Sequence, residues 1–247
     1  MGTSNSINSR TFINGKKIIM NVILEFNGLP ATGKSTIAKE LLNSLNDCGI
    51  KCCSSYRRHS RYIKLEKLCS IGCWKVYLTS LCFTLSLKPR CEEQYGPKKF
   101  VQYYKTYKDF LSNNDNTILI KDQGFFQFII SAIHLRTMGN TRCLLKLIRS
   151  FSSIGMFFIR IDCDADIDTV YSRLTSRTNG ESRFDKITDG SAKQKMTYQK
   201  EHFSIVRSLF SQVYSKDSVI QIDTSNTVDY NVNVIKEHLL KLSIINH

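Results

Sequence analysis

Residues 28–35 of this 247-residue chain read Gly28-Leu29-Pro30-Ala31-Thr32-Gly33-Lys34-Ser35, and Thr36 follows. The stretch has the form G-x-x-x-x-G-K-[ST], in which a glycine-bounded turn points successive backbone N–H groups at an anion and the next helix adds its positive end. The apolar run Val22–Phe26 precedes the stretch, and further apolar residues follow it at helical spacing: Ile37, Ala38, Leu41, Leu42 and Leu45. A strand, a loop and a helix in this order predict a phosphate-binding loop rather than an ordinary turn.

Each residue type that the motif specifies has a chemical function. The lysine reaches the β- and γ-phosphates of a nucleotide, and the hydroxyl of the last residue binds Mg²⁺. We therefore expect residues 28–36 to bind a nucleotide, with Lys34 on its phosphates and Ser35 on the metal.

The rest of the chain alternates strand-like and helix-like segments. Residues 1–19 are rich in Ser, Asn and Thr and are expected to form a flexible extension. From residue 20 the pattern predicts a single α/β domain, 20–247, in which a five-stranded parallel sheet has helices on both faces and a helical lid at about 173–190. The expected strands are 22–26, 50–55, 117–121, 156–161 and 219–222, and the longest expected helices cover 34–47, 125–136, 142–151, 190–214 and 228–242. Two further helices are expected between 61 and 112, with a break at 89–97.

Charge and cysteine usage limit the class of protein. Lys and Arg number 35 against 21 Asp and Glu, and residues 51–110 alone hold 13 basic and 4 acidic side chains. This local excess favours a phosphorylated substrate, with nucleic acid or an anionic membrane as alternatives. Nine cysteines without a C-x-x-C pair, and a start that lacks a secretory segment, predict a reduced, cytoplasmic compartment.

Some conspicuous side chains are better explained by packing than by function. Cys69 and Cys73 have no further ligands at metal-binding spacing, so we expect them in the core. The segment Leu68–Leu87 is interrupted by polar side chains and is a poor membrane span. A stripe of aromatic side chains is likewise expected to be core rather than a base-stacking surface: Tyr103, Tyr104, Tyr107 and Phe110.

An acidic residue ends the third expected strand. Asp122 follows Thr117–Lys121, a position from which a carboxylate can hold Mg²⁺ or accept a proton from an attacking hydroxyl. The next residue is Gln123, so the glutamate that activates water in a hydrolysing ATPase is missing from this position. This favours transfer of a phosphoryl group to an acceptor over hydrolysis.

Arginines gather at two further places. Arg57 and Arg58 follow the second expected strand, where they can bind an acceptor at the carboxyl edge of the sheet. Arg173, Arg177 and Arg183 surround a glycine-containing loop, an arrangement typical of a lid that closes on a transferring phosphoryl group.

From Asn21 to Leu242 the chain resembles the P-loop nucleoside-monophosphate kinases, most closely thymidylate-kinase-like proteins. The matching pieces are the loop at 28–36, Asp122 as the strand-end acid, and the segment Ile161–Arg183 with its arginines. The resemblance implies ATP and Mg²⁺ as cofactors and a nucleoside monophosphate as acceptor, bound by Arg57, Arg58 and Gln123. The chain departs from that pattern in three places. Ala31 stands where many of these loops have glycine, Tyr56–Ser60 replaces an R-E-P-G-G-type segment, and Gln123 replaces an arginine.

Two other functions remain open at this stage. One is a kinase of a sugar, an antibiotic or a lipid precursor, in which Asp122 would act as the base. The other is a nucleotide-binding regulatory protein with little turnover, which would use the basic stretch 51–110. Nucleic acid is disfavoured as a partner because no recognised module is present. The oligomeric state, a homodimer included, is not determined by the sequence.

Overall fold

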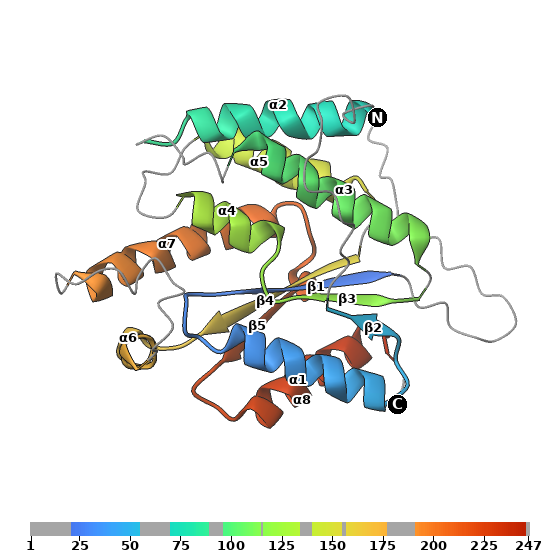
Figure 1. The fold of residues 1–247 in the computed structure, drawn as a ribbon, viewed down its shortest axis with the longest axis vertical. Helices are drawn as coiled ribbons and strands as arrows, with labels where there is room; N and C mark the ends of the chain where they lie inside the picture. Colours follow the sequence, from blue (N-terminus) through green and yellow to red (C-terminus); the bar gives the residue numbers. More distant parts are fainter. Residues whose placement is uncertain are drawn as a thin grey trace, which may run out of the picture.

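The computed structural model describes residues 21–54, 70–88, 96–114, 116–133, 140–154, 157–176 and 191–245. Helices lie on both sides of a central sheet (Figure 1). The expected extension at 1–19, Cys69, and the arginines Arg57, Arg58, Arg177 and Arg183 fall outside the described residues, as does the expected lid beyond Ser176.

The sheet has five parallel strands in the order β2-β3-β1-β4-β5, as the alternating pattern predicts. Its strands are β1 (Val22–Asn27), β2 (Cys52–Cys53), β3 (Ile118–Lys121), β4 (Phe157–Asp164) and β5 (Val219–Asp223). Strand β1 is central and pairs with β3 on one side and β4 on the other. The loop after β1 therefore opens at the carboxyl edge of the sheet, beside the ends of β3 and β4.

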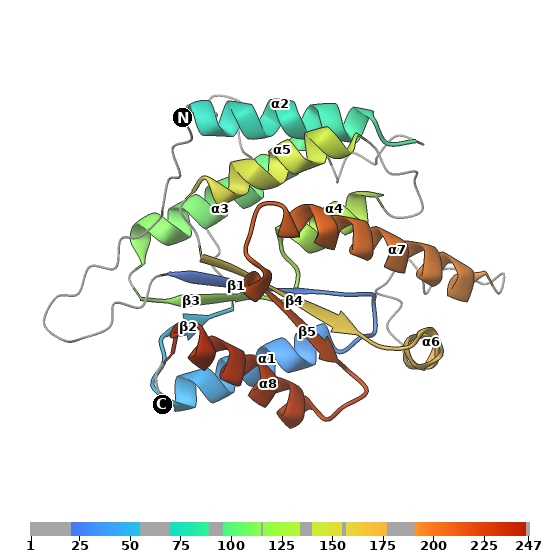
Figure 2. The ribbon, with the colours of Figure 1, turned by 180° about the vertical axis from the view of Figure 1, so that it is seen from behind.

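The helices form two layers. They are α1 (Lys34–Asp47), α2 (Ile71–Leu85), α3 (Pro97–Asn113), α4 (Phe125–Ile133), α5 (Thr141–Ser152), α6 (Ile167–Thr175), α7 (Ala192–Ser211) and α8 (Val228–Lys241). Helices α1 and α8 cover one face of the sheet, and the opposite face carries α4 and α7, with α2, α3 and α5 farther out (Figures 1 and 2). Helix α6 lies at the edge where β4 ends. In the described part of the chain, no helix has the length and apolarity that crossing a bilayer requires.

Local signals account for several helix starts. The side chains of Ser70, Asn140, Asp166 and Thr227 each accept a backbone N–H from the first turn of the helix that follows. These residue types satisfy N–H groups that have no partner within the helix itself. Helix α3 instead begins at Pro97, whose fixed φ suits the first helical position.

Two apolar clusters fill the spaces between the layers. On the α1 and α8 face, Leu24 and Phe26 of β1 pack with buried side chains such as Leu41 and Ile235. On the opposite face the core is aromatic, and Phe125 stacks on Phe151 with ring centroids 3.6 Å apart. Of the predicted aromatic stripe on α3, Tyr104, Tyr107 and Phe110 are buried in this cluster and Tyr103 packs against it, and Cys73 is buried there too. The prediction that these side chains are core is confirmed.

Strands β2 and β4 differ most from expectation. Strand β2 covers Cys52–Cys53 of the expected 50–55, of which Ser55 lies outside the described residues. It starts late because the Ile50 N–H donates to the Leu45 carbonyl and so completes the end of α1. Strand β4 continues through Asp164, since β5 offers paired partners for Asp162 and Asp164.

Candidate functional site

The loop between β1 and α1 has a backbone that only some residues adopt without strain. Gly33 has φ of 81° and Ala31 has φ of 65°, both in the left-handed region. Gly28 is needed for a different reason, because a Cβ at this position would lie 2.5 Å from the carbonyl oxygen of Cys163. Helix α1 starts at Lys34 without a side-chain cap and without an acidic residue in its first turn. Its positive end is thus left open to an anion.

Lys34 lies inside the loop rather than out in solvent. Its ammonium group donates to the carbonyl oxygens of Gly28 at 3.0 Å and Leu29 at 2.6 Å, and to the Thr32 hydroxyl at 3.3 Å. The Cys163 thiol is nearby, and burial raises its pKa to about 12, so it stays neutral beside the lysine. The structure therefore places the positive charge of Lys34 at the turn that the sequence assigns to phosphate.

Ser35 and Asp122 meet although 87 residues separate them. The Ser35 hydroxyl donates to Asp122 Oδ2 at 3.1 Å, and both side chains are exposed at the mouth of the loop. The contact follows from the sheet order, because β3 lies directly beside β1 and both strands end at the same edge. Gln123 is exposed next to Asp122.

This pair of oxygen ligands suits Mg²⁺. The ion prefers a few hard oxygen donors from protein and takes its remaining ligands from water and phosphates. Within the described ranges no group of three or more His, Cys, Asp or Glu side chains could hold a metal by itself. The residues fit a metal that is shared with a bound nucleotide, held by Ser35 and Asp122.

Helix α4 contacts the phosphate loop through a side chain that the sequence did not single out. Gln127 Oε1 accepts the N–H of Gly28 at 3.0 Å. The start of α4 is itself held by Glu25 of β1, whose carboxylate accepts the N–H groups of Phe126 and Gln127. The only advance signal for Glu25 is an acidic residue within an otherwise apolar strand.

Two arginines share one buried carboxylate at β4. Asp162 accepts from Arg160 Nε and, through its other oxygen, from Arg207 Nε of α7, both at 2.6 Å. Arg160 is fully buried, and its guanidinium lies 5.7 Å from the ring centre of Phe126. The two terminal nitrogens of Arg160 have no hydrogen-bond partner within the described part of the chain. The network ties α7 to β4.

Arg173, the described member of the predicted lid arginines, lies at the end of β5. Its guanidinium donates to the carbonyl oxygen of Thr224 at 3.0 Å. Thr224 in turn donates through its N–H and its hydroxyl to the Asp164 carbonyl, which joins the ends of β4 and β5. A role for Arg173 in phosphoryl transfer stays a prediction.

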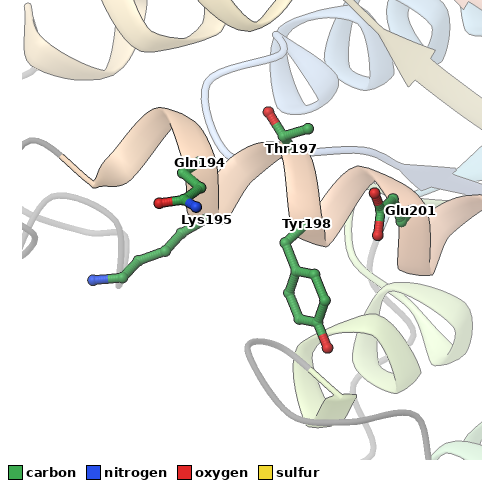
Figure 3. A pocket seen from close by; sticks show the side chains of 5 residues that line it. All are labelled: Gln194, Lys195, Thr197, Tyr198 and Glu201. Carbon is green, nitrogen blue, oxygen red and sulfur yellow. The ribbon is translucent and has the colours of Figure 1, made fainter.

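A pocket of about 460 Å³ runs along the first half of α7. Its lining contains amide, ammonium, hydroxyl, aromatic and carboxylate groups from Gln194, Lys195, Thr197, Tyr198 and Glu201. Figure 3 shows Lys195 and Tyr198 extending from the same side of the helix. Both ribbon views place the start of α7, α6 and the β1–α1 loop at the same end of the molecule (Figures 1 and 2).

Comparisons with known proteins give fold-level likeness only. No family model matches the sequence, and no curated protein matches it. Among solved structures, the chain is similar to deoxyadenosine kinase from M. mycoides with bound dATP, at 14% identity over 89% of this chain and 100% of that chain, with a TM-score of 0.49. The same enzyme with the products dCMP and a flexible dCDP gives 15% identity, 90% and 100% coverage, and a TM-score of 0.43. The crystal structure of APE1195 gives 16% identity, 93% and 100% coverage, and a TM-score of 0.44. The chemistry of the site is therefore inferred from this chain's own residues.

Proposed function

We propose that this protein transfers the γ-phosphoryl group of ATP to a nucleoside monophosphate, with Mg²⁺ as cofactor. The observation that carries the proposal is the 3.1 Å contact between Ser35 and Asp122 at the mouth of the phosphate loop. It joins a metal-binding hydroxyl and a strand-end carboxylate at the point where a nucleotide's phosphates would lie.

Each proposed site residue has a role that follows from its position and its charge. Loop N–H groups and Lys34 would bind the donor phosphates. Ser35 and Asp122 would hold Mg²⁺, which when bound would supply positive charge at the phosphates. A phosphate oxygen of the acceptor bonds to the γ-phosphorus while the bond from that phosphorus to the β–γ bridging oxygen breaks and ADP leaves. Arg173, Arg177 and Arg183 are proposed to stabilise the charge that spreads over the transferring group.

The contact that Asp122 makes with Ser35 bears on the class of the acceptor. A sugar hydroxyl needs a base to take its proton, whereas the phosphate of a nucleoside monophosphate is already an oxyanion. Asp122 accepts from Ser35, the other proposed metal ligand, and we assign it to the metal and not to a base; Gln123 beside it cannot act as a base. The pocket along α7 offers the aromatic face of Tyr198 and the charge of Lys195, groups that suit a base and a phosphate.

An acceptor screen with labelled ATP tests the proposal. Nucleoside monophosphates, nucleosides, sugars and water are compared, and the first group is expected to accept label. Lys34→Ala should lower transfer at least about 10²-fold, because a positioned charge on the phosphates is lost. Lys39→Ala, an exposed lysine later in the same helix, is the matched control and should keep activity. Label found only in non-phosphorylated alcohols or only in free phosphate would refute the acceptor class.

The metal site needs its own variants. Ser35→Ala and Asp122→Asn are each expected to raise the Mg²⁺ concentration that gives half-maximal rate, because one oxygen ligand is removed or neutralised. Asp47→Asn at the exposed end of α1 is the control. An unchanged Mg²⁺ dependence in both site variants would show that the pair does not hold the metal.

A further inference from the structure

Glu25 is a fully buried carboxylate in the middle of β1, three residues before the phosphate loop. One of its oxygens, Oε1, accepts the N–H groups of Phe126 and Gln127 in the first turn of α4. The other, Oε2, accepts the Tyr107 hydroxyl of α3 at 3.3 Å. No acidic residue of α4 itself lies in that first turn. A strand residue thus takes over the capping task that a residue just before the helix usually performs.

The segment held in this way joins the two parts of the proposed site. Asp122 lies three residues before the start of α4, and Gln127 on α4 accepts the Gly28 N–H at 3.0 Å. Gly124 between them packs on the carboxylate so closely that a Cβ there would lie 2.4 Å from the carboxyl carbon of Glu25. The position of Asp122 relative to the loop therefore depends on how firmly Glu25 holds the start of α4.

The hydrogen bonds around Glu25 favour its ionised form, because all of them reach it as donors. The Phe125 N–H donates to the Tyr107 oxygen at 3.2 Å, and the Tyr107 hydroxyl donates to Glu25 Oε2. A proton on Oε2 makes this oxygen a donor and a weaker acceptor for the tyrosine hydroxyl. The chain of donors from α4 through α3 to β1, in the direction seen here, is therefore strongest when Oε2 is unprotonated.

The surroundings of Glu25 place its ionisation near neutrality. Burial raises its pKa from 4.5 to about 7, although the N–H groups of α4, the attraction of Arg160 on β4 and the Tyr107 hydroxyl oppose that rise. Lys121 on β3 is paired with Glu25 in the sheet register. Tyr214 after α7 lies close enough for the negative charge of Glu25 to raise the pKa of the Tyr214 hydroxyl.

We propose that Glu25 is a positioning residue for phosphoryl transfer, which in its ionised form holds the segment from Asp122 to Gln127 against the phosphate loop. The inference rests on the proposed function, because it assigns Glu25 to the same site. It adds a dependence of the site's geometry on the protonation of Glu25, which the proposed roles of the loop and the metal ligands do not include.

Glu25→Gln tests this role, because it keeps the size and one oxygen acceptor but carries no charge. The first readout is hydrogen exchange of the Phe126 and Gln127 amides followed by NMR, which needs no substrate. In the wild type these amides should gain protection as the pH rises through about 7, relative to other amides of the core. In Glu25→Gln this gain should be absent. Equal protection in both proteins would overturn the proposal.

The second readout is the pH profile of kcat at saturating ATP, Mg²⁺ and acceptor. The wild-type kcat should rise as the pH rises through about 7, and the kcat of Glu25→Gln should lack this rise. Above about pH 7 the kcat of the variant should be on the order of tenfold lower than that of the wild type. The KM for ATP should change less, because Lys34 and the loop remain in place. If the pH profile of kcat were the same in Glu25→Gln and in the wild type, the proposal would be refuted even if amide protection differed. Glu25 would then have only a structural role.

Tyr107→Phe tests the hydrogen-bond chain from its other side. It should lower kcat, and its effect should not add to that of Glu25→Gln, since both break one chain. Tyr104→Phe on the same helix is the matched control, because its hydroxyl lies beside Gly72 and not at Glu25. Fully additive effects would contradict the chain. A wild-type protein that phosphorylates no acceptor would refute the proposed function, while the amide measurement would still decide whether Glu25 holds α4.

Discussion

Replacing Glu25 with glutamine should remove the loss of stability that the wild type undergoes as the pH rises through about 7, while making the protein a poorer catalyst. Its pKa of about 7 in the folded protein exceeds the ordinary 4.5 because burial disfavours the charged form. Between these values the folded state keeps a proton that the unfolded chain has lost. The stability that this group contributes is therefore complete below pH 4.5 and is lost as the pH rises through about 7.

The size of the effect follows from the two pKa values. At about 1.4 kcal/mol per pH unit, the interval from 4.5 to about 7 amounts to about 3 kcal/mol. The glutamine variant does not titrate, so it escapes this loss. Between about pH 4 and about pH 8 the wild type should lose about 3 kcal/mol more of its free energy of unfolding than the variant loses.

Urea unfolding of both proteins at several pH values measures the difference. Glu237→Gln, the same substitution at an exposed site on α8, controls for the change of residue type. Parallel curves of unfolding free energy against pH for the wild type and Glu25→Gln would refute the reasoning, because they would mean that Glu25 ionises alike in both states. A variant that is more stable and also less active would be typical of a functional group that is retained at a cost in stability.

Three further substitutions test particular contacts by urea or thermal unfolding. Ala31→Gly should stabilise by about 1 kcal/mol, because φ of 65° is strained for alanine; a loss of stability would argue against this loop backbone. Asp162→Asn should cost about 3–5 kcal/mol, because it leaves the charges of Arg160 and Arg207 without their shared carboxylate, and a cost below about 1 kcal/mol would contradict the network. Gly124→Ala should cost about 1–3 kcal/mol and lower kcat, since its methyl group would meet a buried carboxylate; full activity would show that the segment can move without consequence.

The sequence predicted those parts of the fold that depend on neighbouring residues. The loop at 28–36, the helix that follows it and the buried strand before Asp122 each carry their signal within a short window, as a motif or as a hydrophobic period. The five-stranded parallel sheet followed from the alternation of such windows, and the structure confirms it. The kinase hypothesis came from the same residues, with family resemblance added.

What the sequence left undecided depends on pairing between distant segments. The late start of β2 depends on the Ile50 N–H, which bonds to the end of α1 and does not continue the strand. The meeting of Ser35 with Asp122 was expected only as a shared role in binding Mg²⁺, and the contact itself requires β3 to lie beside β1.

Glu25 is the clearest example of a residue whose contacts the sequence did not predict. In the sequence it is one acidic residue within an apolar strand, and nothing nearby indicates a partner. Its role appears only when α4 and α3, whose contacting residues lie about a hundred and about eighty positions away, bring their donors to its two oxygens. The proposed phosphate loop could therefore be predicted from the sequence itself, because the chemistry expected of it lies in consecutive backbone groups. The support that holds Asp122 against that loop was decided by tertiary structure, because a buried charge is set by what the fold packs around it.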